Sequence, residues 1–96
     1  MTEIRQTEQY AKWFKSLRDY NARVRIDIRI RRLSLGNPGD VRSVGVGISE
    51  LRIDYGPGYR VYYLQRDTEI ILLLTGGDKS SQKKDIVKAK EIAKSV

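Results

Sequence analysis

The sequence contains no cysteine and no histidine among its 96 residues. The absence of cysteine excludes disulfides, thiolate nucleophiles and the usual zinc ligand sets. The absence of histidine removes the commonest general base, so any catalysis must use Lys, Arg, Tyr, Asp or Glu side chains. We therefore expect neither a metal site nor a bound cofactor.

Long hydrophobic runs are also missing. The longest apolar stretch, residues 70–74, is far shorter than the ~20 residues that a membrane-spanning helix needs. The N-terminal residues contain no apolar signal-peptide core. We therefore predict a cytoplasmic protein that makes no membrane contact. A chain of 96 residues with 40% hydrophobic content can bury one core, which predicts a single domain over residues 1–96.

The charge balance is strongly basic, with a formal net charge of +7. The excess lies in residues 1–33 and 75–96, whereas the central residues 34–74 are slightly acidic. A basic surface of this kind favours binding to a polyanion or to an acidic protein. The alternative is a soluble basic domain whose charges only face water.

The pattern of residues in the N-terminal third of the chain predicts a helix, which a short strand can precede. Residues 3–6 are a short segment that can form a first strand, and Thr7 suits a helix N-cap. An apolar stripe at helical spacing follows, which we interpret as core, and it consists of Tyr10, Trp13, Phe14 and Leu17.

Residues 21–35 fit two patterns. Apolar and charged residues alternate from Val24 to Arg31 as in a strand, but Ala22, Ile26 and Ile30 also recur at helical spacing. The segment contains no glycine or proline over a length greater than that of a usual strand, and Gly36 follows it as a helix stop. We therefore predict a helix whose arginine-rich outer face is either solvated or used by a partner.

The rest of the chain predicts strands and one more helix. The strands cover residues 41–46, 48–54, 59–66 and 69–75, and their short connections indicate an antiparallel meander. Residues 70–74 are apolar on both faces, which predicts a central strand covered on both sides. After Gly76 and Gly77, an apolar stripe predicts a C-terminal helix. This order indicates an α+β domain with its helices on one side of the sheet.

The alternation along two neighbouring strands predicts their register. If the apolar residues of both strands share the core face, Asp54 lies opposite Arg60 and Arg52 lies opposite Tyr62. The loop between the strands then has an odd number of residues.

This register gathers a set of polar side chains on an open sheet face, with others from the junction after the last strand. The predicted set is Arg52, Arg60, Tyr62, Lys79, Gln82 and Lys83. Two guanidinium groups suit the oxygens of a phosphate, and an exposed aromatic ring can stack on a base. The competing interpretation is structural, with Asp54 paired to Arg60 and Tyr62 filling a surface groove.

Three segments in order give the chain a family resemblance. ELRIDYGPGYRVYY, the segment LLTGGDKSSQKKDI and the upstream RRLSLGNPGDVRSVG together resemble the RelE/ParE superfamily of bacterial toxins. The branch most similar to them is that of the addiction-module killer proteins, described as HigB-like. The resemblance covers nearly the whole chain and implies an RelE-like α+β fold. In that fold, two N-terminal helices pack on a four-stranded antiparallel sheet, with a C-terminal helix.

The resemblance also implies a function, the toxin of a type II toxin–antitoxin system. RelE-like relatives cut mRNA in the ribosomal A site, so the implied partners are ribosome-bound mRNA and a small helix-turn-helix or acidic antitoxin. By motif position, Arg60 matches the family's sheet arginine, and Arg52 lies where relatives place a basic residue. RelE has an arginine just after the last strand and a tyrosine further on, whereas this chain has lysines there. Proton transfer would then fall to Lys79 or Lys83.

A ribosome-dependent endoribonuclease is the function that we favour from the sequence, with Arg52, Arg60, Lys79 and Lys83 as catalytic residues and Tyr62 and Gln82 as substrate-binding residues. The main alternative is a non-enzymatic ParE-like inhibitor of DNA gyrase, which would have the same fold. A plain RNA-binding module is a third interpretation, and it would not arrest growth.

Overall fold

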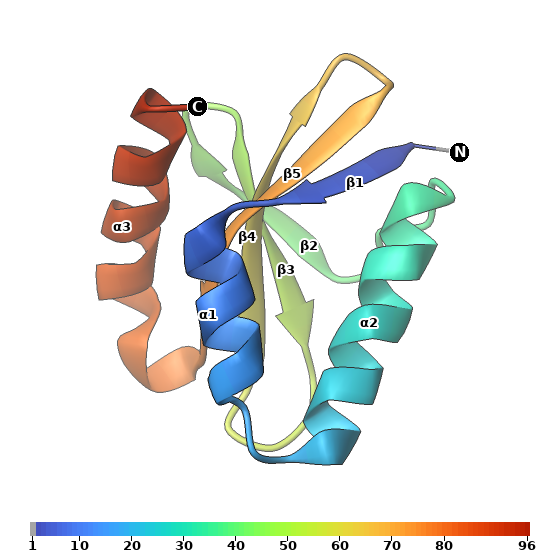
Figure 1. The fold of residues 1–96 in the computed structure, drawn as a ribbon, viewed down its shortest axis with the longest axis vertical. Helices are drawn as coiled ribbons and strands as arrows, with labels where there is room; N and C mark the ends of the chain where they lie inside the picture. Colours follow the sequence, from blue (N-terminus) through green and yellow to red (C-terminus); the bar gives the residue numbers. More distant parts are fainter. Residues whose placement is uncertain (1) are drawn as a thin grey trace.

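Residues 2–96 are described by a computed structural model, in which a mixed five-stranded sheet carries helices on both faces (Figure 1). In chain order the elements are β1 (Glu3–Gln6), α1 (Glu8–Ser16), α2 (Tyr20–Ser34), β2 (Val41–Gly45), β3 (Ile48–Ile53), β4 (Tyr59–Arg66), β5 (Ile70–Gly77), the 3-10 turn η1 (Lys79–Ser81) and α3 (Gln82–Lys94). The α+β class is therefore as predicted. No helix within the described residues is both long and apolar enough to cross a membrane.

The expected four-stranded antiparallel sheet is wrong. The strand order is β1-β5-β4-β3-β2, and β1 adds a fifth strand that runs parallel to β5. The other neighbouring pairs are antiparallel. A parallel neighbour is possible because a long connection, residues 7–69, lies between β1 and β5. The four-residue β1 is mostly exposed, so its sequence carries little of the alternation that identifies a strand.

The expected placement of the helices on one side of the sheet is also wrong. On one face, α1 lies along β5 and α2 lies by β3, and Figure 1 shows the two helices diverging instead of packing as a pair. Their buried side chains share one core with the sheet. On the opposite face, α3 packs on β4 and β5 around a second core. Tyr62 and Leu74 belong to this second core, which the apolar residues on both faces of β4 and β5 make possible.

Side-chain caps begin the first two helices, and the cap of α1 is the predicted Thr7. The Thr7 side chain accepts a hydrogen bond from the backbone N–H of Tyr10, and the Asp19 side chain accepts from those of Asn21 and Ala22. The ambiguous segment is helical, as predicted, because Ala22 and other residues at helical spacing are buried on its inner side. Also as predicted, β5 is an interior strand covered on both faces.

The hairpin of β3 and β4 has a different register from the predicted one. Arg52 lies opposite Arg60, and Glu50 lies opposite Tyr62. A shift of two residues leaves every side chain on the same sheet face, so alternation does not distinguish the two registers. The loop has an odd number of residues, as predicted, and left-handed φ angles of 57° at Gly56 and 79° at Gly58 set where it turns.

The end of β5 lies unusually close to both helical layers. A Cβ atom added to Gly76 would lie 2.4 Å from the Trp13 ring of α1. A Cβ added to Gly77 would lie 1.8 Å from Oδ2 of Asp85 in α3. The two glycines therefore let α1 and α3 close on opposite faces of the same strand.

We expect Gly76→Ala to lower the free energy of unfolding by about 1–3 kcal/mol, because the Trp13 ring must move out of a packed core. Gly77→Ala is the matched control. Its loss should be smaller, because the Asp85 carboxylate can rotate away. Urea unfolding of both variants measures the difference, and an equal or larger loss for Gly77→Ala would contradict this account of the two contacts.

Candidate functional site

A surface groove with a volume of about 490 Å³ lies beside the β3–β4 hairpin, and we call it the hairpin groove. Its lining combines three basic side chains, two acidic ones and the glycine-rich loop: Arg52, Arg60, Lys79, Asp40, Asp54, Ile53, Gly56, Pro57 and Gly58. Three of the predicted site residues, Arg52, Arg60 and Lys79, therefore meet at one place. The groove suits a small anionic group such as a phosphate.

Different elements bring the three basic side chains together. Arg52 and Arg60 are directly opposite each other on neighbouring strands. Lys79 belongs to η1, which begins beside the hairpin loop, and its backbone N–H donates to the carbonyl oxygen of Pro57 at 3.4 Å. Gly58 is also close to Lys79, since a Cβ there would lie 3.4 Å from that of Lys79, which is an ordinary van der Waals contact.

Arg29 of α2 supports the groove from behind. One guanidinium nitrogen donates to the backbone carbonyl oxygen of Arg52 at 2.5 Å, and the other donates to those of Pro38 at 3.0 Å and Asp40 at 3.1 Å. The backbone N–H of Arg52 also donates to the Asp40 carbonyl oxygen at 3.0 Å. Arg29 thus fixes the loop after α2 against the strand that carries Arg52.

A fully buried carboxylate lies next to the groove. Glu50 of β3 is 0% exposed, and it accepts hydrogen bonds from Arg60 Nη1 at 3.3 Å, Tyr62 Oη at 3.0 Å and Gln82 Nε2 at 2.9 Å. The Glu50–Arg60 contact is a buried ion pair. We call these four residues the Glu50 cluster. It ties two strands to the first residue of α3.

Arg60 belongs to both the groove and the Glu50 cluster. Its side chain lines the groove, yet the residue is only 6% exposed. Its Nε atom is buried and, among the described residues, has no hydrogen-bond partner. A buried donor without a partner costs free energy, so an acceptor that entered the groove and reached it would be bound favourably.

The prediction that this sheet face is open is wrong, because α3, which begins at Gln82, covers it. Tyr62 is 0% exposed, so its ring cannot stack on a base in this structure. The alternative pairing of Asp54 with Arg60 is also wrong, since Glu50 is the partner. The cause is the two-residue shift in register, which places Glu50 opposite Tyr62.

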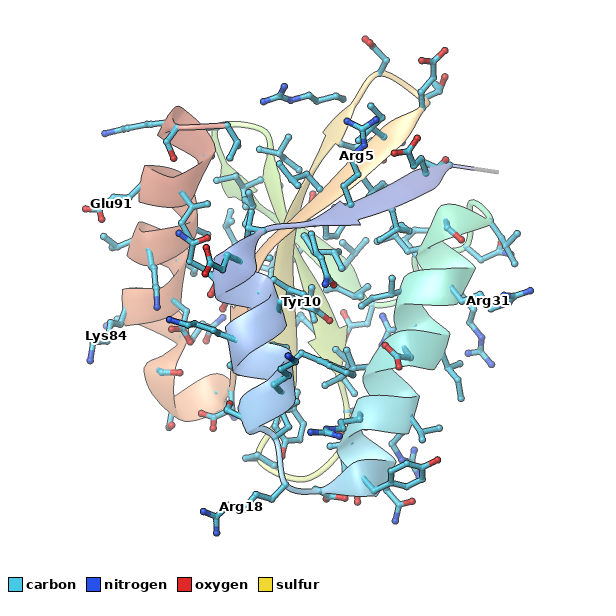
Figure 2. All side chains as sticks on the ribbon, in the orientation of Figure 1. Arg5, Tyr10, Arg18, Arg31, Lys84 and Glu91 are labelled. Atoms are coloured by element: carbon cyan, nitrogen blue, oxygen red, sulfur yellow. The ribbon has the colours of Figure 1, made fainter. Side chains whose placement is uncertain are left out.

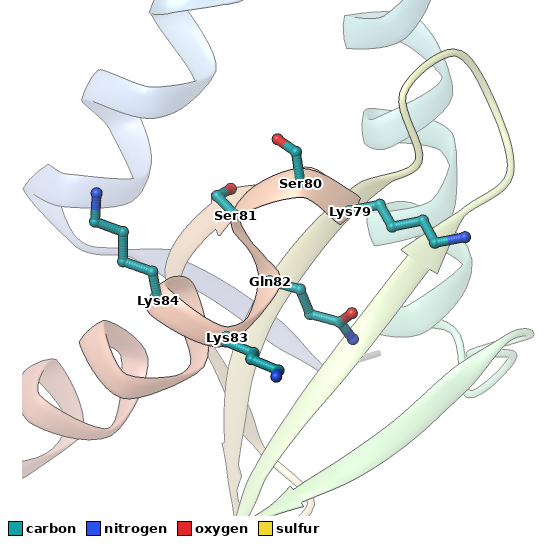
Figure 3. A pocket seen from close by; sticks show the side chains of 6 residues that line it. All are labelled: Lys79, Ser80, Ser81, Gln82, Lys83 and Lys84. Atoms are coloured by element: carbon teal, nitrogen blue, oxygen red, sulfur yellow. The ribbon is translucent and has the colours of Figure 1, made fainter.

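The remaining predicted residues come from η1 and the start of α3. Figure 3 shows Lys79 and Gln82 extending toward the β3–β4 hairpin, whereas Lys84 points the other way. Lys83 does not line the hairpin groove. It lines a neighbouring hollow of about 440 Å³, together with Lys79 and Gln82.

Three acidic residues were missed as site residues. Glu50 lies on the same strand face as Arg52, so the sequence contained the signal, but only the correct register reveals its partners. Asp40 lies at the end of the loop before β2, and Asp54 lies at the start of the loop after β3. Their spacing in the sequence does not indicate that both line one groove. Among the described residues, no group of three or more Asp and Glu side chains is placed to hold a metal ion.

Two buried tyrosines provide a matched test of the Glu50 cluster. Burial raises the pKa of the Tyr62 hydroxyl well above its usual range, and the hydrogen bond to Glu50 raises it further. Burial also raises the pKa of Tyr10, whose hydroxyl is buried and without a partner among the described residues.

At pH 7 we expect Tyr62→Phe to lower the free energy of unfolding by about 1.5–3 kcal/mol, because it removes a hydrogen bond to a charged group. Tyr10→Phe should be neutral or stabilising. Both pKa values are raised in the folded state, so the protein should lose stability as pH rises above the unfolded value of about 10. Each variant should lessen that loss, which unfolding measurements from pH 8 to 11 would show. A larger loss for Tyr10→Phe than for Tyr62→Phe at pH 7 would contradict this assignment.

Comparison with known proteins gives one family. Residues 12–95 match the family described as phage derived protein Gp49-like. An uncharacterised protein of Haemophilus influenzae is 47% identical over 91 residues, which cover 95% of this chain and 92% of that protein.

A solved structure gives the same fold from a more distant sequence. A copper-bound mutant toxin from Helicobacter pylori superposes with a TM-score of 0.64 at 18% sequence identity. The match covers 84% of this chain and 98% of the toxin. At this identity the likeness concerns the fold.

Proposed function

The chain belongs to the phage-derived Gp49-like family, and we propose that it is the toxin of a type II toxin–antitoxin pair that cuts mRNA on the ribosome. The fold shared with a bacterial toxin supports the first part of this proposal. The resemblance of three sequence segments to the RelE/ParE superfamily supports the second. The partners are then the ribosome-bound mRNA and an antitoxin, and the working site is the hairpin groove.

The observation that carries the proposal is the basic lining of the hairpin groove. Arg52, Arg60 and Lys79 converge there, and among the described residues the buried Nε of Arg60 has no hydrogen-bond partner. Guanidinium groups bind phosphate oxygens through paired donors, and Lys79 adds a mobile positive charge. Asp40 and Asp54 also line the groove, so its charge is mixed and not uniformly basic. A mixed lining favours one phosphate held in a defined position over non-specific binding of a polyanion.

The proposed reaction is an internal transfer at one RNA phosphate. The ribose 2′-oxygen attacks the adjacent phosphorus and loses its proton, the bond from phosphorus to the 5′-oxygen breaks, and that oxygen takes up a proton. The products are a 2′,3′-cyclic phosphate and a 5′-hydroxyl. Arg52, Arg60 and Lys79 stabilise the extra negative charge of the pentacovalent phosphorane, which is the largest contribution such a site can make.

The structure of the groove also limits which side chains can transfer protons in this reaction. Tyr62 is excluded as the proton acceptor, because it is buried and its raised pKa keeps the hydroxyl protonated. Lys79 and the carboxylates of Asp40 and Asp54 line the groove, so they are the candidates for proton transfer at the reacting oxygens. Lys83 lies outside the groove and is assigned to holding the RNA backbone nearby. Gln82 positions the start of α3 through Glu50.

Induced expression tests the proposed function against its main alternative. An mRNA-cutting toxin should arrest growth with an immediate stop in protein synthesis and with cleaved transcripts. A gyrase inhibitor should instead cause DNA damage and altered plasmid supercoiling while translation continues. Growth without arrest would contradict both readings and leave an RNA-binding module.

A further inference from the structure

Helix α2 is apolar on two opposite sides. Its inner side is buried against the sheet through Ala22, Ile26, Ile30 and Leu33. The outer side carries apolar residues at i, i+4, i+8 and i+15, of which Tyr20 is 73% exposed, Val24 37%, Ile28 45% and Leu35, just past the helix end, 52%. We call these four residues the α2 outer stripe. Single exposed apolar residues are common, but an aligned row on one helix face marks a contact surface.

The α2 outer stripe is bordered by positive charge. The helix contains five arginines and a single aspartate, Asp27. Arg29 is occupied with backbone carbonyl oxygens, and Arg25 lies over the Tyr55 ring at 4.5 Å. Arg31 and Arg32 are exposed, and Figure 2 shows Arg31 extending away from the fold.

A hollow of about 310 Å³ adjoins the stripe on the side facing β3. Ile28 and Ile53 provide its apolar lining, and Arg25, Arg29, Arg32 and Asp54 line the rest. An apolar side chain can enter this hollow while a carboxylate beside it meets the arginines. The site therefore combines a place for an apolar anchor with a basic rim.

The apolar stripe and its basic border together favour one kind of binding partner over the others. A second copy of the chain would place arginine-rich helices against each other, which like charges disfavour. A nucleic acid would meet the arginines but leave the α2 outer stripe without an apolar partner. An amphipathic helix with an apolar row and flanking Asp or Glu residues satisfies both the stripe and its rim.

We propose that the α2 outer stripe is a docking surface for an acidic amphipathic helix of a protein partner. The proposal depends on the exposure and charge of α2, and it is independent of the chemistry at the hairpin groove. A catalytically dead protein would still bind this helix, and a failed docking proposal would leave the groove chemistry unaffected.

Site-specific photo-crosslinking tests the proposal in cells of the organism that encodes the chain. The full chain carries p-benzoylphenylalanine in place of Ile28, and the control carries it in place of the exposed Lys84 on α3. After irradiation, mass spectrometry identifies the crosslinked peptide. We expect a protein segment with apolar residues at helical spacing and an excess of Asp and Glu. Its yield should fall at least about tenfold in an Arg31→Glu, Arg32→Glu background and persist with Arg31→Lys, Arg32→Lys.

Four results would overturn the proposal: a crosslink to a second copy of this chain, a crosslink to nucleic acid, a crosslink to a basic or non-helical segment, or a yield no higher than that of the Lys84 control. Circular dichroism of each variant shows whether the fold is retained. All the substituted side chains are outside the buried core, so we expect unchanged melting.

Discussion

Replacing Glu50 with alanine should lower the free energy of unfolding by about 3–5 kcal/mol, because it leaves the buried Arg60 guanidinium without its counter-charge. The same change removes the acceptor for Tyr62 and Gln82. Domains of this size have total stabilities of about 5–15 kcal/mol, so the variant should be close to unfolding at 37 °C. Urea denaturation at 25 °C measures the loss.

Two further variants distinguish the destabilisation caused by an unpaired buried charge from that caused by lost packing. Glu69→Ala removes an exposed glutamate and should change the stability by less than about 0.5 kcal/mol. The double variant Glu50→Met, Arg60→Met removes both buried charges and should recover most of the loss, since a buried pair is often replaceable by apolar residues. A Glu50→Ala protein as stable as the wild type would contradict the Glu50 cluster.

Replacing Arg52 with alanine should abolish growth arrest while the fold remains intact. Arg52 lines the hairpin groove and is not fully buried, so its side chain carries little of the core packing. Removing one group that stabilises the developing charge typically costs a factor of about 10²–10³ in rate. Arg52→Lys should also be impaired, because a point charge does not replace the paired donors of a guanidinium. Lys79→Met should weaken arrest as well.

Arg66→Ala is the matched control for these variants. Arg66 is an exposed arginine at the opposite end of β4, and its removal should leave growth arrest unchanged. Arg60 is a poor test residue, because its removal would leave Glu50 as an unpaired buried charge and destabilise the fold. A folded Arg52→Ala protein that arrests growth as the wild type does would show that the groove is not the working site.

The sequence predicted the helices well because their signals are local. Caps at Thr7 and Asp19 and the apolar residues of α2 lie within a few turns of each other. The strand β1 was only an open possibility, since four mostly exposed residues carry no clear alternation. The apolar pattern of β5 indicated that both of its faces are covered, but local periodicity does not specify which helix lies on which face.

The candidate site was predicted in part. Arg52, Arg60 and Lys79 do meet at one groove, because a short hairpin joins the strands of the two arginines and Lys79 follows β5, the strand that pairs with β4. The predicted exposure of Arg60 and Tyr62 was wrong, because α3 covers that face of the sheet. Their partner Glu50 was missed because a two-residue shift in register preserves the pattern of faces. The Glu50 cluster depends on that register and on Gln82, which lies 32 residues from Glu50 along the chain. Long-range pairings of this kind are visible only in the structure.

Primer extension on ribosome-bound mRNA with the purified protein tests the central claim most directly. The wild type should produce discrete cuts that end in a 2′,3′-cyclic phosphate and a 5′-hydroxyl, and only when ribosomes are present. The Arg52→Ala protein should cut at least about 10²-fold more slowly, and the Arg66→Ala protein should cut at the wild-type rate. An absence of wild-type cleavage on ribosomes, or equal cleavage by a folded Arg52→Ala protein, would contradict the proposed function of the hairpin groove.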